Sequence, residues 1–225
     1  MIESKIQQLL NSFLNADREK SLNIIRAYSK ANTTAKALNE LIEPVQEKIG
    51  EMWEKGEELS LAQAYVIAKV VEDFMFEIAS EIKVENVNCV GTAVIGNIMD
   101  DYHSLGRKLI KIFLESAGWE IIDLGNDVEP SVFVDKAIEN KARIIGVSAM
   151  MYSTAKNIKM VREELDKRGL SSKIMLAVGG AVFKVRPSLC DEVGGDGTAN
   201  NALLVPNLFE TLLVKAVKGE TDELH

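Results

Sequence analysis

The spacing of the hydrophobic residues changes once along the chain, and this change limits the folds available to it. In the first part they recur every three or four positions, as in Ile6, Leu9 and Phe13, which is the spacing of one helical face. Later, short β-branched runs alternate with helical stretches. We therefore expect a helical domain at residues 1–83, a polar linker, and an α/β domain at residues 88–225.

The helical domain contains four amphipathic segments separated by short polar breaks. The third runs from about Thr34 to Gly56, and Pro44 should kink or split it because the proline ring clashes with the preceding turn. The fourth begins near Ser60, whose hydroxyl is a suitable N-cap. Four helices of this size predict a small four-helix bundle.

The second domain has the pattern of an α/β fold. Strands are expected at residues 88–95, 120–124, 143–149, 173–178 and, weakly, 195–198, with helices at 104–117, 130–140, 154–169 and 200–217 and a helical turn near 186–191. The strands are apolar along their length, as when helices cover both faces of a sheet. Alternating strands and helices imply parallel βαβ units with right-handed crossovers. We expect a five-stranded, parallel, doubly wound sheet of the flavodoxin or Rossmann-like type.

Charge and cysteine content exclude several classes of function. The net charge is −8 and no Lys/Arg cluster stands out, which argues against a nucleic-acid partner. Cys89 and Cys190 lack CxxC spacing, which argues against a zinc site or a disulfide framework and for a reducing compartment. No apolar run approaches the ~20 residues of a membrane span, and the N-terminus does not resemble a signal peptide. We expect a cytoplasmic protein.

One of the two histidines, His103, follows the first predicted strand. In an open parallel sheet, ligands bind where the carboxyl ends of the strands meet a switch in strand order. Ser148 ends the third strand, Gly179-Gly180 ends the fourth, and Thr198 follows the fifth. We therefore expect these residues to converge at one edge of the sheet.

These residues suggest a small-molecule site. His103 can act as a metal ligand or an acid–base group, and Asp101 is close enough to hydrogen-bond one ring nitrogen and leave the other facing outward. No second His or Cys lies nearby, so a metal held in its own macrocycle fits better than a protein-only cage. Taken singly, each residue has a simpler explanation: a surface histidine, an ordinary Gly-Gly turn, a capping serine.

The residues at the strand ends form a spaced motif, Asp101-x-His103-x-x-Gly106 … Ser148-x-Met150 … Gly179-Gly180. This motif resembles the D-x-H-x-x-G … S-x-L … G-G signature of cobalamin-binding domains. The stretch LESAGWEIIDLGNDVEPSVFVDKA looks like the family segment that joins the first helix, second strand and second helix. The stretch IGEMWEKGEELSLAQAYVIAKVV is similar to the helical cap of methionine synthase and of methanogen- and acetogen-type corrinoid proteins, so the resemblance covers nearly the whole chain.

The resemblance implies base-off/His-on binding of cobalamin, in its methyl or hydroxo form, with His103 as the lower axial ligand to cobalt. Asp101 would accept the other ring N–H, and Ser148 would hydrogen-bond the buried nucleotide tail. The other implied cofactor contacts are Ser104, Leu105, Gly106, Met150, Tyr152, Thr154, Gly179, Gly180, Thr198 and, over the upper face, Trp53.

Four positions depart from the family pattern. Ser104 replaces an acid, Lys108 an amide and Met150 a leucine, and Tyr152 stands where a small hydroxyl residue is usual. Tyr152 would narrow the tail slot or supply a phenol donor. These differences leave open which corrinoid and which partner the chain uses.

The resemblance implies a non-catalytic methyl carrier that works with methyltransferase subunits on the donor and acceptor sides and with a reductive activase, and it leaves a homodimer open. The alternatives are a cobalamin-dependent sensor or regulator, the small subunit of a cobalamin-dependent mutase, and a flavodoxin-like domain that binds another nucleotide. In the sensors a Trp is followed ten residues later by Glu-His, whereas Trp53 is followed by Gln63-Ala64. A mutase would need a substrate barrel on another chain. For FMN, the first loop lacks the Ser/Thr-rich phosphate-binding run.

Overall fold

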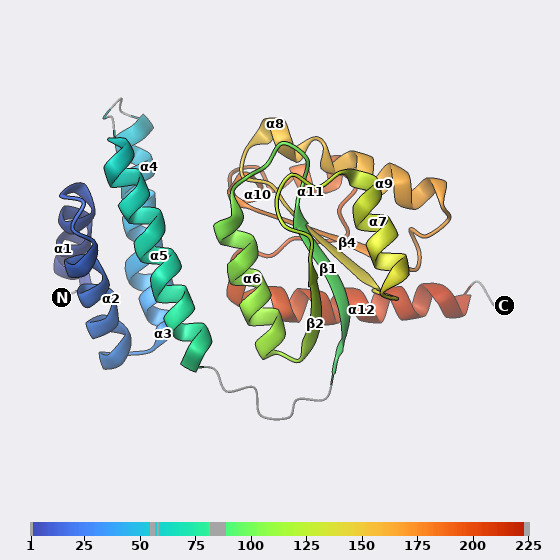
Figure 1. Cartoon of the computed structure of the whole chain (residues 1–225), viewed down its shortest axis with the longest axis horizontal. Helices are drawn as coiled ribbons and strands as arrows, with labels where there is room; N and C mark the ends of the chain where they lie inside the picture. The colour runs from blue at the N-terminus through green and yellow to red at the C-terminus, as the bar shows by residue number, and fades with distance from the viewer. Residues whose placement is uncertain (1, 55–56, 58, 82–88, 223–225) are drawn as a thin grey trace. The chain divides into compact units, whose positions relative to one another are not determined.

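In the computed structural model, which describes residues 2–54, 57, 59–81 and 89–222, the chain divides into a helical unit, Met1–Ile82, and an α/β unit, Lys83–His225 (Figure 1). Each unit has its own hydrophobic core. Among the helices of these described residues, none is both long enough and apolar enough to cross a bilayer.

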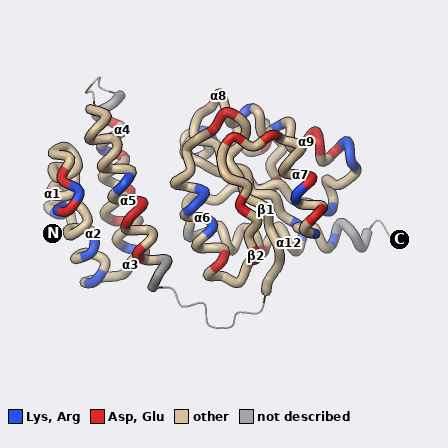
Figure 2. The backbone as a smooth tube through the Cα atoms, viewed as in Figure 1, with Lys and Arg blue, Asp and Glu red and all other residues tan. Residues whose placement is uncertain are grey.

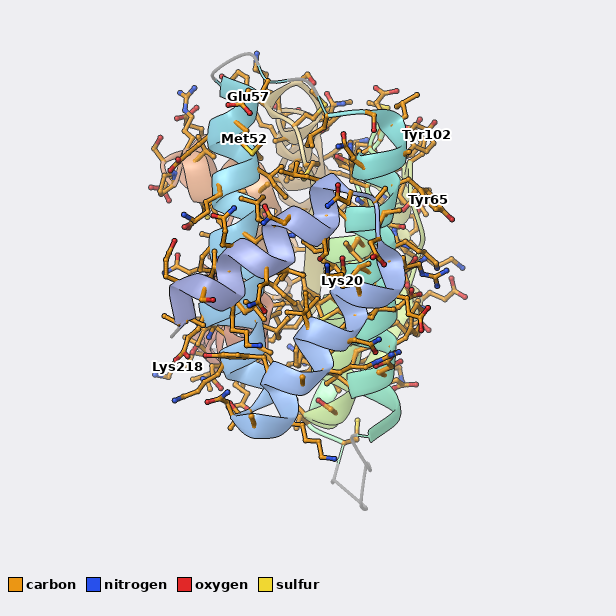
Figure 3. All side chains as sticks on the ribbon, turned by 90° about the vertical axis from the view of Figure 1, so that its left-hand side faces the viewer. Lys20, Met52, Glu57, Tyr65, Tyr102 and Lys218 are labelled. Carbon is orange, nitrogen blue, oxygen red and sulfur yellow. The ribbon has the colours of Figure 1, made fainter. Side chains whose placement is uncertain are left out.

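The helical unit is built from four rods. Its elements are α1 (Ile2–Leu14), α2 (Arg18–Ala31), α3 (Thr34–Lys36), the π-helical turn η1 (Ala37–Ile42), α4 (Glu43–Glu54) and α5 (Leu61–Glu81). The segments α3, η1 and α4 follow one another without a break, so they form one rod. Leu9, Phe13 and Ile25 are fully buried between the rods, whereas Tyr65 on α5 lies on the surface (Figure 3).

Pro44 does not split the third rod, although the sequence allowed this, since α3, η1 and α4 are continuous through it. The π-helical turn η1 stands directly before it, and its wider spacing accommodates a residue that has no N–H to donate and whose ring crowds the preceding turn. The start of the fourth rod agrees with the sequence prediction. The Ser60 hydroxyl accepts from the N–H of Gln63, and the Gln63 side chain accepts from the N–H of Ser60, which is a capping box.

The α/β unit consists of four parallel strands with helices on both faces. Its elements are β1 (Gly91–Asn97), α6 (Ser104–Ser116), β2 (Trp119–Asp123), α7 (Pro130–Glu139), β3 (Ile144–Ser148), α8 (Tyr152–Ala155), α9 (Ile158–Lys167), β4 (Met175–Gly179), α10 (Ala181–Val185), α11 (Leu189–Glu192), the 3-10 turn η2 (Ala202–Leu204) and α12 (Val205–Asp222). The strand order is β2-β1-β3-β4. The doubly wound parallel fold is thus confirmed.

The predicted fifth strand, at 195–198, is not formed as a strand. This segment makes a single bridge to the sheet, between Gly197 and Ala177. Two of its four residues are glycines, and the carboxylate of Asp196 takes the N–H of Leu176 in place of a main-chain acceptor. Glycine offers no side chain to pack on a pleated surface, so the segment lies beside β4 without extending the ladder.

Two predicted helices differ from those observed, and one short helix was not predicted. The helix expected at 154–169 is divided into α8 and α9. The helical turn expected near 186–191 is observed as α11, and α10 is the additional helix before it. The last helix begins at Val205 rather than at residue 200. Pro206 occupies its first turn, where the missing N–H costs nothing.

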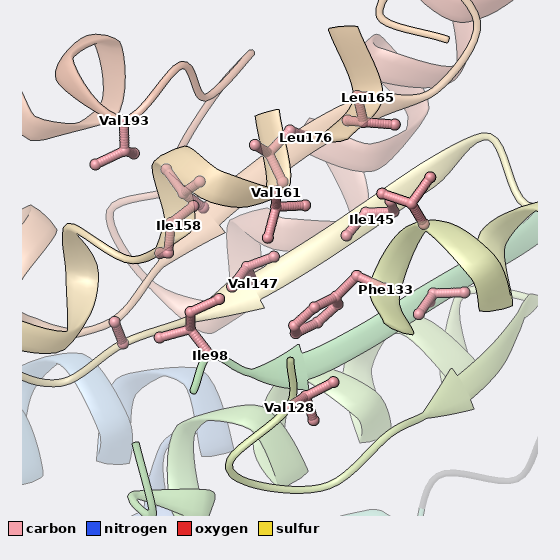
Figure 4. Packing of buried hydrophobic residues seen from close by; sticks show 14 of the residues in the cluster. Ile98, Val128, Phe133, Ile145, Val147, Ile158, Val161, Leu165, Leu176 and Val193 are labelled. Atoms are coloured by element: carbon pink, nitrogen blue, oxygen red, sulfur yellow. The ribbon is translucent and has the colours of Figure 1, made fainter. Parts of the chain in front are cut away.

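Side chains that alternate along the strands fill two hydrophobic cores. One face of the sheet packs against α7 and α9, with Phe133 and Val161 fully buried beside Ile145 and Val147 (Figure 4). The other face packs against α6 and α12 and contains Phe209. Because both faces are covered, the strands are apolar along their length.

Charged residues of both signs are interspersed along the helices of each unit (Figure 2). Several of them pair along or between helices, such as Lys136 with Glu139 on α7 and Arg168 with Asp135.

Candidate functional site

The carboxyl ends of three adjacent strands lie at the same level. Asn97 of β1 is in register with Ser148 of β3, and Ser148 is in register with Gly179 of β4. The chain passes from β1 to β2 on one side and to β3 on the other, so the strand order reverses between β1 and β3. Ligands of doubly wound folds bind at this switch point. The register thus brings together the strand ends that the sequence predicts to converge.

Asp101 lies at the centre of this edge and is fully buried. Its Oδ1 accepts hydrogen bonds from Nδ2 of Asn97 (2.8 Å) and from the main-chain N–H of His103 (3.0 Å). Its Oδ2 accepts from the main-chain N–H of Met150 (2.7 Å) and from the hydroxyl of Thr154 (3.2 Å). One carboxylate therefore joins the loop after β1 to the loop after β3 and to α8.

The hydrogen bonds to Asp101 keep it ionised. Burial acts to raise the pKa of this carboxyl and is the largest single influence on it. The N–H groups of Met150 and His103 and the amide of Asn97 together outweigh burial, so the pKa of Asp101 lies below its usual range. The site therefore contains a fixed anion at neutral pH.

His103 immediately precedes α6, with its ring at the edge of the sheet. The side chain is 54% exposed, and its Nδ1 lies 3.5 Å from Oδ1 of Asp101. That oxygen also binds the main-chain N–H of His103, so the carboxylate positions both the backbone and the ring. A carboxylate behind an accessible imidazole is the arrangement that orients histidine ligands of metals.

The glycines near His103 and at the end of β4 differ in whether the backbone requires a glycine at that position. A Cβ on Gly180 would lie 1.9 Å from the carbonyl oxygen of Ala149, and its φ is +119°, so only glycine fits there. A Cβ on Gly179 or on Gly106 would meet nothing within 4 Å. Gly180 is therefore required by the backbone, whereas Gly179 and Gly106 border open space that a ligand can use.

Thr198 lies beyond β4 with its hydroxyl turned inward. The Oγ1 atom is buried and has no hydrogen-bond partner among the described residues. Buried hydroxyls are normally satisfied, so the Thr198 hydroxyl is available to hydrogen-bond a bound polar group.

Exposed apolar side chains follow β3. Met150 is 46% exposed and Tyr152 is 40% exposed. The Tyr152 ring has Lys156 Nζ 4.4 Å from its centroid and Arg186 Cζ 5.1 Å from it, which are cation–π distances. Tyr152 thus presents a partly covered aromatic face close to the switch point.

The loop between β2 and α7, in which the sequence analysis named no site residue, also holds the loop between β1 and α6 that carries His103 (the histidine loop). The Tyr102 hydroxyl donates to Oδ2 of Asp127 (2.6 Å), and Oδ1 of Asp127 accepts from the N–H of Asp100 (2.8 Å). These hydrogen bonds raise the pKa of Tyr102 and lower that of Asp127. The segment that carries His103 is therefore fixed on two sides.

Arg107 and Asn97 were also missed. Arg107 shares one face of α6 with Ile110 and Leu114, at helical spacings of three and seven residues. A charged residue in an otherwise apolar helical stripe is the signal that would have identified it.

Ser104 and Leu105 are half-buried in the first turn of α6. Trp53 belongs to α4, but its side chain lies outside the described residues. Within the described ranges, no cluster of three or more His, Cys, Asp or Glu side chains is placed to hold a metal ion.

The donor set at this edge fits a cobalamin. A single accessible imidazole with a carboxylate behind it suits a metal whose other ligands come from a macrocycle. The open space beside Gly179 and the unpaired hydroxyl of Thr198 suit an inserted polar tail, and exposed Met150 offers an apolar contact.

Comparison with known families agrees with this geometry. Residues 91–205 match the model of a B12 binding domain, and residues 5–76 match a second model that is also described as a B12 binding domain. The chain belongs to the B12-binding family. The predicted family and the predicted class of cofactor, a cobalamin or other corrinoid, are therefore confirmed.

Several relatives of this B12-binding protein come from Methanosarcina species. The chain is 30% identical to dimethylamine corrinoid protein 2 of Methanosarcina mazei over 89% of its own length and 92% of that protein. It is 33% identical to trimethylamine corrinoid protein 1 of Methanosarcina acetivorans over 75% and 77% of the two lengths. The structure of the Methanosarcina barkeri monomethylamine corrinoid protein shares the fold with a TM-score of 0.81, at 21% identity, over 94% of this chain and 100% of that one.

Proposed function

We propose that the chain is a corrinoid carrier that receives a methyl group from one methyltransferase subunit and delivers it to another. The observation that carries the proposal is the edge itself: an accessible His103 held by a buried, ionised Asp101, beside open space at Gly179. The relatives named as methylamine corrinoid proteins make methylated amines the first methyl donors to test. A separate reductive activase is a further proposed partner, whereas a homodimer and a cytoplasmic location stay predictions.

In this proposal the chain's residues bind and orient the cobalamin. The bound cobalamin supplies the cobalt that accepts and releases the methyl group. His103 would hold the bound corrinoid through one ring nitrogen. Oδ1 of Asp101, 3.5 Å from Nδ1 of His103, would accept a hydrogen bond from the other ring nitrogen and so fix the tautomer. Thr198 and Ser148 offer hydroxyls to the nucleotide tail.

The sensor alternative is weakened by Gln63. This residue stands ten positions after Trp53, where the sensors have Glu-His. Its side chain accepts from the N–H of Ser60 (2.7 Å) and donates to the carbonyl of Leu14 (2.5 Å). Both ends of the amide are therefore used to start α5 and to join it to α1.

The first test is the absorption spectrum of the purified protein mixed with hydroxocobalamin. We expect a base-off/His-on spectrum for the wild type, and for His103→Ala a spectrum without the His-on form. His225→Ala, which removes the chain's only other histidine, is the matched control and should behave as the wild type. Identical spectra for His103→Ala and the wild type would rule out the ligand assignment.

The second test separates a carrier from a sensor. A carrier, reduced and loaded with cobalamin, should become methylated when a methylamine-specific methyltransferase and its amine are added. A change of assembly on illumination of the adenosylcobalamin-loaded protein, without methylation, would favour the sensor.

A further inference from the structure

Arg107 places a cation directly behind the histidine loop. It lies in the first turn of α6 and is only 6% exposed. The N-terminal end of a helix disfavours positive charge, and burying a guanidinium is costly unless it is fully paired. An apolar residue would complete the stripe formed with Ile110 and Leu114. Packing therefore does not explain why an arginine stands here.

The partners of Arg107 come from three places in the sequence. Its Nε lies 2.7 Å from Oδ1 of the half-buried Asp123 at the end of β2, which makes an ion pair although the contact lacks hydrogen-bond geometry. Its Nη1 donates to Oδ1 of Asn97 at the end of β1 (2.6 Å) and to Oδ1 of Asn126 in the loop after β2. The guanidinium thus joins two strand ends and the loop that also holds Tyr102.

Asn97 lies between Arg107 and the candidate site and hydrogen-bonds to both. It is fully buried, and its Nδ2 donates to Oδ1 of Asp101 (2.8 Å) and to the carbonyl oxygen of His103 (3.1 Å). A guanidinium has only donors, so Arg107 requires the amide oxygen of Asn97 to face it. The amide nitrogen must then face Asp101 and His103, whose oxygens are acceptors.

Oδ1 of Asp101, which Asn97 holds, is also the carboxylate oxygen nearest the imidazole, 3.5 Å from Nδ1 of His103. We propose that Arg107, acting through Asn97, is a positioning residue that orients the Asp101 carboxylate beneath the His103 ring. The proposal rests on the proposed function for its effect on cobalamin binding, and it also predicts a property of the cofactor-free protein.

The test compares Arg107→Met with the wild type in hydroxocobalamin titrations followed by absorption. Loss of a residue that orients a metal ligand typically costs about 10–100-fold in affinity. We expect a loss in this range for Arg107→Met and a lower His-on fraction at saturation. Arg107→Lys, which keeps the charge and one hydrogen bond, should recover part of both. Asn97→Ser should reproduce the loss, and adding Arg107→Met to it should cost little more because the two residues act in one chain.

Arg168→Met is the matched control. Arg168, like Arg107, is an arginine in an ion pair, here with Asp135 and Glu164, but it follows α9 and precedes β4, at the amino edge of the sheet. Arg168→Met should leave both the affinity for hydroxocobalamin and the His-on fraction unchanged. Circular dichroism of every variant establishes that the fold is retained. If Arg107→Met does not fold, Arg107→Lys and Asn97→Ser decide the question.

A cofactor-free measurement keeps this proposal separate from the proposed function. In ¹⁵N-histidine-labelled protein without cobalamin, long-range ¹⁵N–¹H spectra report which ring nitrogen of His103 carries the proton, and His103→Ala assigns the signals. We expect the Nδ1–H tautomer to dominate in the wild type and to decline in Arg107→Met. Unchanged tautomers and unchanged affinity in folded Arg107→Met and Asn97→Ser would overturn the positioning role. A wild type that gives no His-on spectrum would overturn the proposed function, and the tautomers would still judge the role of Arg107.

Discussion

The two units of the chain bury polar groups for different reasons. In the described part of the helical unit, the fully buried polar residues are Ser12 and Ser21, whose hydroxyls lie 2.7 Å apart and each also bond a main-chain carbonyl. In the described part of the α/β unit the buried polar residues are Asn97, Asp101 and Arg107, which form one connected network under the histidine loop. The first pair joins two helices, whereas the second group includes two charges.

The two sets of buried polar groups differ in the free energy that their burial costs. A buried pair of neutral hydroxyls costs little once satisfied. Buried charges are expensive and are often no better for stability than apolar residues of similar size. Among the described residues, the helical unit buries neutral polar side chains, whereas the α/β unit buries two charged ones at the sheet edge where the candidate site lies. Four predictions test this contrast, and they follow from the largest expected effect to the smallest.

The first prediction concerns the independence of the two cores. Phe13 in the helical unit and Phe133 in the α/β unit are both fully buried. Each change to alanine should lower the stability of its own unit by about 4 kcal/mol. In a Trp53→Phe background, Trp119 is the remaining tryptophan and reports the α/β unit. Urea unfolding followed by its fluorescence should shift for Phe133→Ala. An equal shift for Phe13→Ala would show that the units do not unfold separately.

The second prediction separates two adjacent glycines. Gly180→Ala places a methyl group against the carbonyl of Ala149 in a backbone conformation that favours glycine, and it should cost about 3 kcal/mol of stability. Gly179→Ala meets nothing within 4 Å, so its stability should stay near that of the wild type while its affinity for cobalamin falls. Thermal unfolding and cobalamin titration of both variants check this. Equal stabilities would contradict the close approach at Gly180.

The third prediction uses the unpaired hydroxyl of Thr198. Thr198→Val removes a buried group that has no partner among the described residues, so the cofactor-free protein should lose no stability. If the hydroxyl bonds the cofactor, affinity should fall about fivefold, the equivalent of about 1 kcal/mol for one hydrogen bond. Thr198→Ser, which keeps the hydroxyl, is the control. A less stable Thr198→Val would mean that the hydroxyl serves the fold.

The fourth prediction concerns acid. A hydrogen bond from Arg26 on α2 chiefly lowers the pKa of Glu77 on α5. Because the folded pKa is depressed, this stabilisation is present above the unfolded pKa of about 4.3 and is lost as the pH falls through the folded value. At pH 7, Glu77→Gln should cost about 0.5 kcal/mol, as exposed pairs do, and near pH 3 the difference should shrink. Urea unfolding at both pH values measures it, and a cost that does not change with pH would contradict the ion pair.

Much of the fold was open to prediction because its signals are local. The period of three to four residues identified the helical rods, and the apolar runs identified β1 to β4. The fifth strand failed because the sheet neighbour of residues 195–198 is β4, about twenty residues away, and because the carboxylate of Asp196 competes for a ladder hydrogen bond. No local sequence pattern predicted that the helix expected at 154–169 is divided into α8 and α9.

The sequence by itself determined that Asp101, His103, Ser148 and Gly179 would reach one edge, because parallel strands deliver their carboxyl ends together. Only the tertiary structure decided how they are held. Asp101 receives the N–H of Met150 and the hydroxyl of Thr154 from about fifty residues away, and Arg107 reaches Asp123 across a helix and a strand. Hydrogen-bond partners of this kind depend on burial and distance in three dimensions, which residue spacing along one chain does not specify.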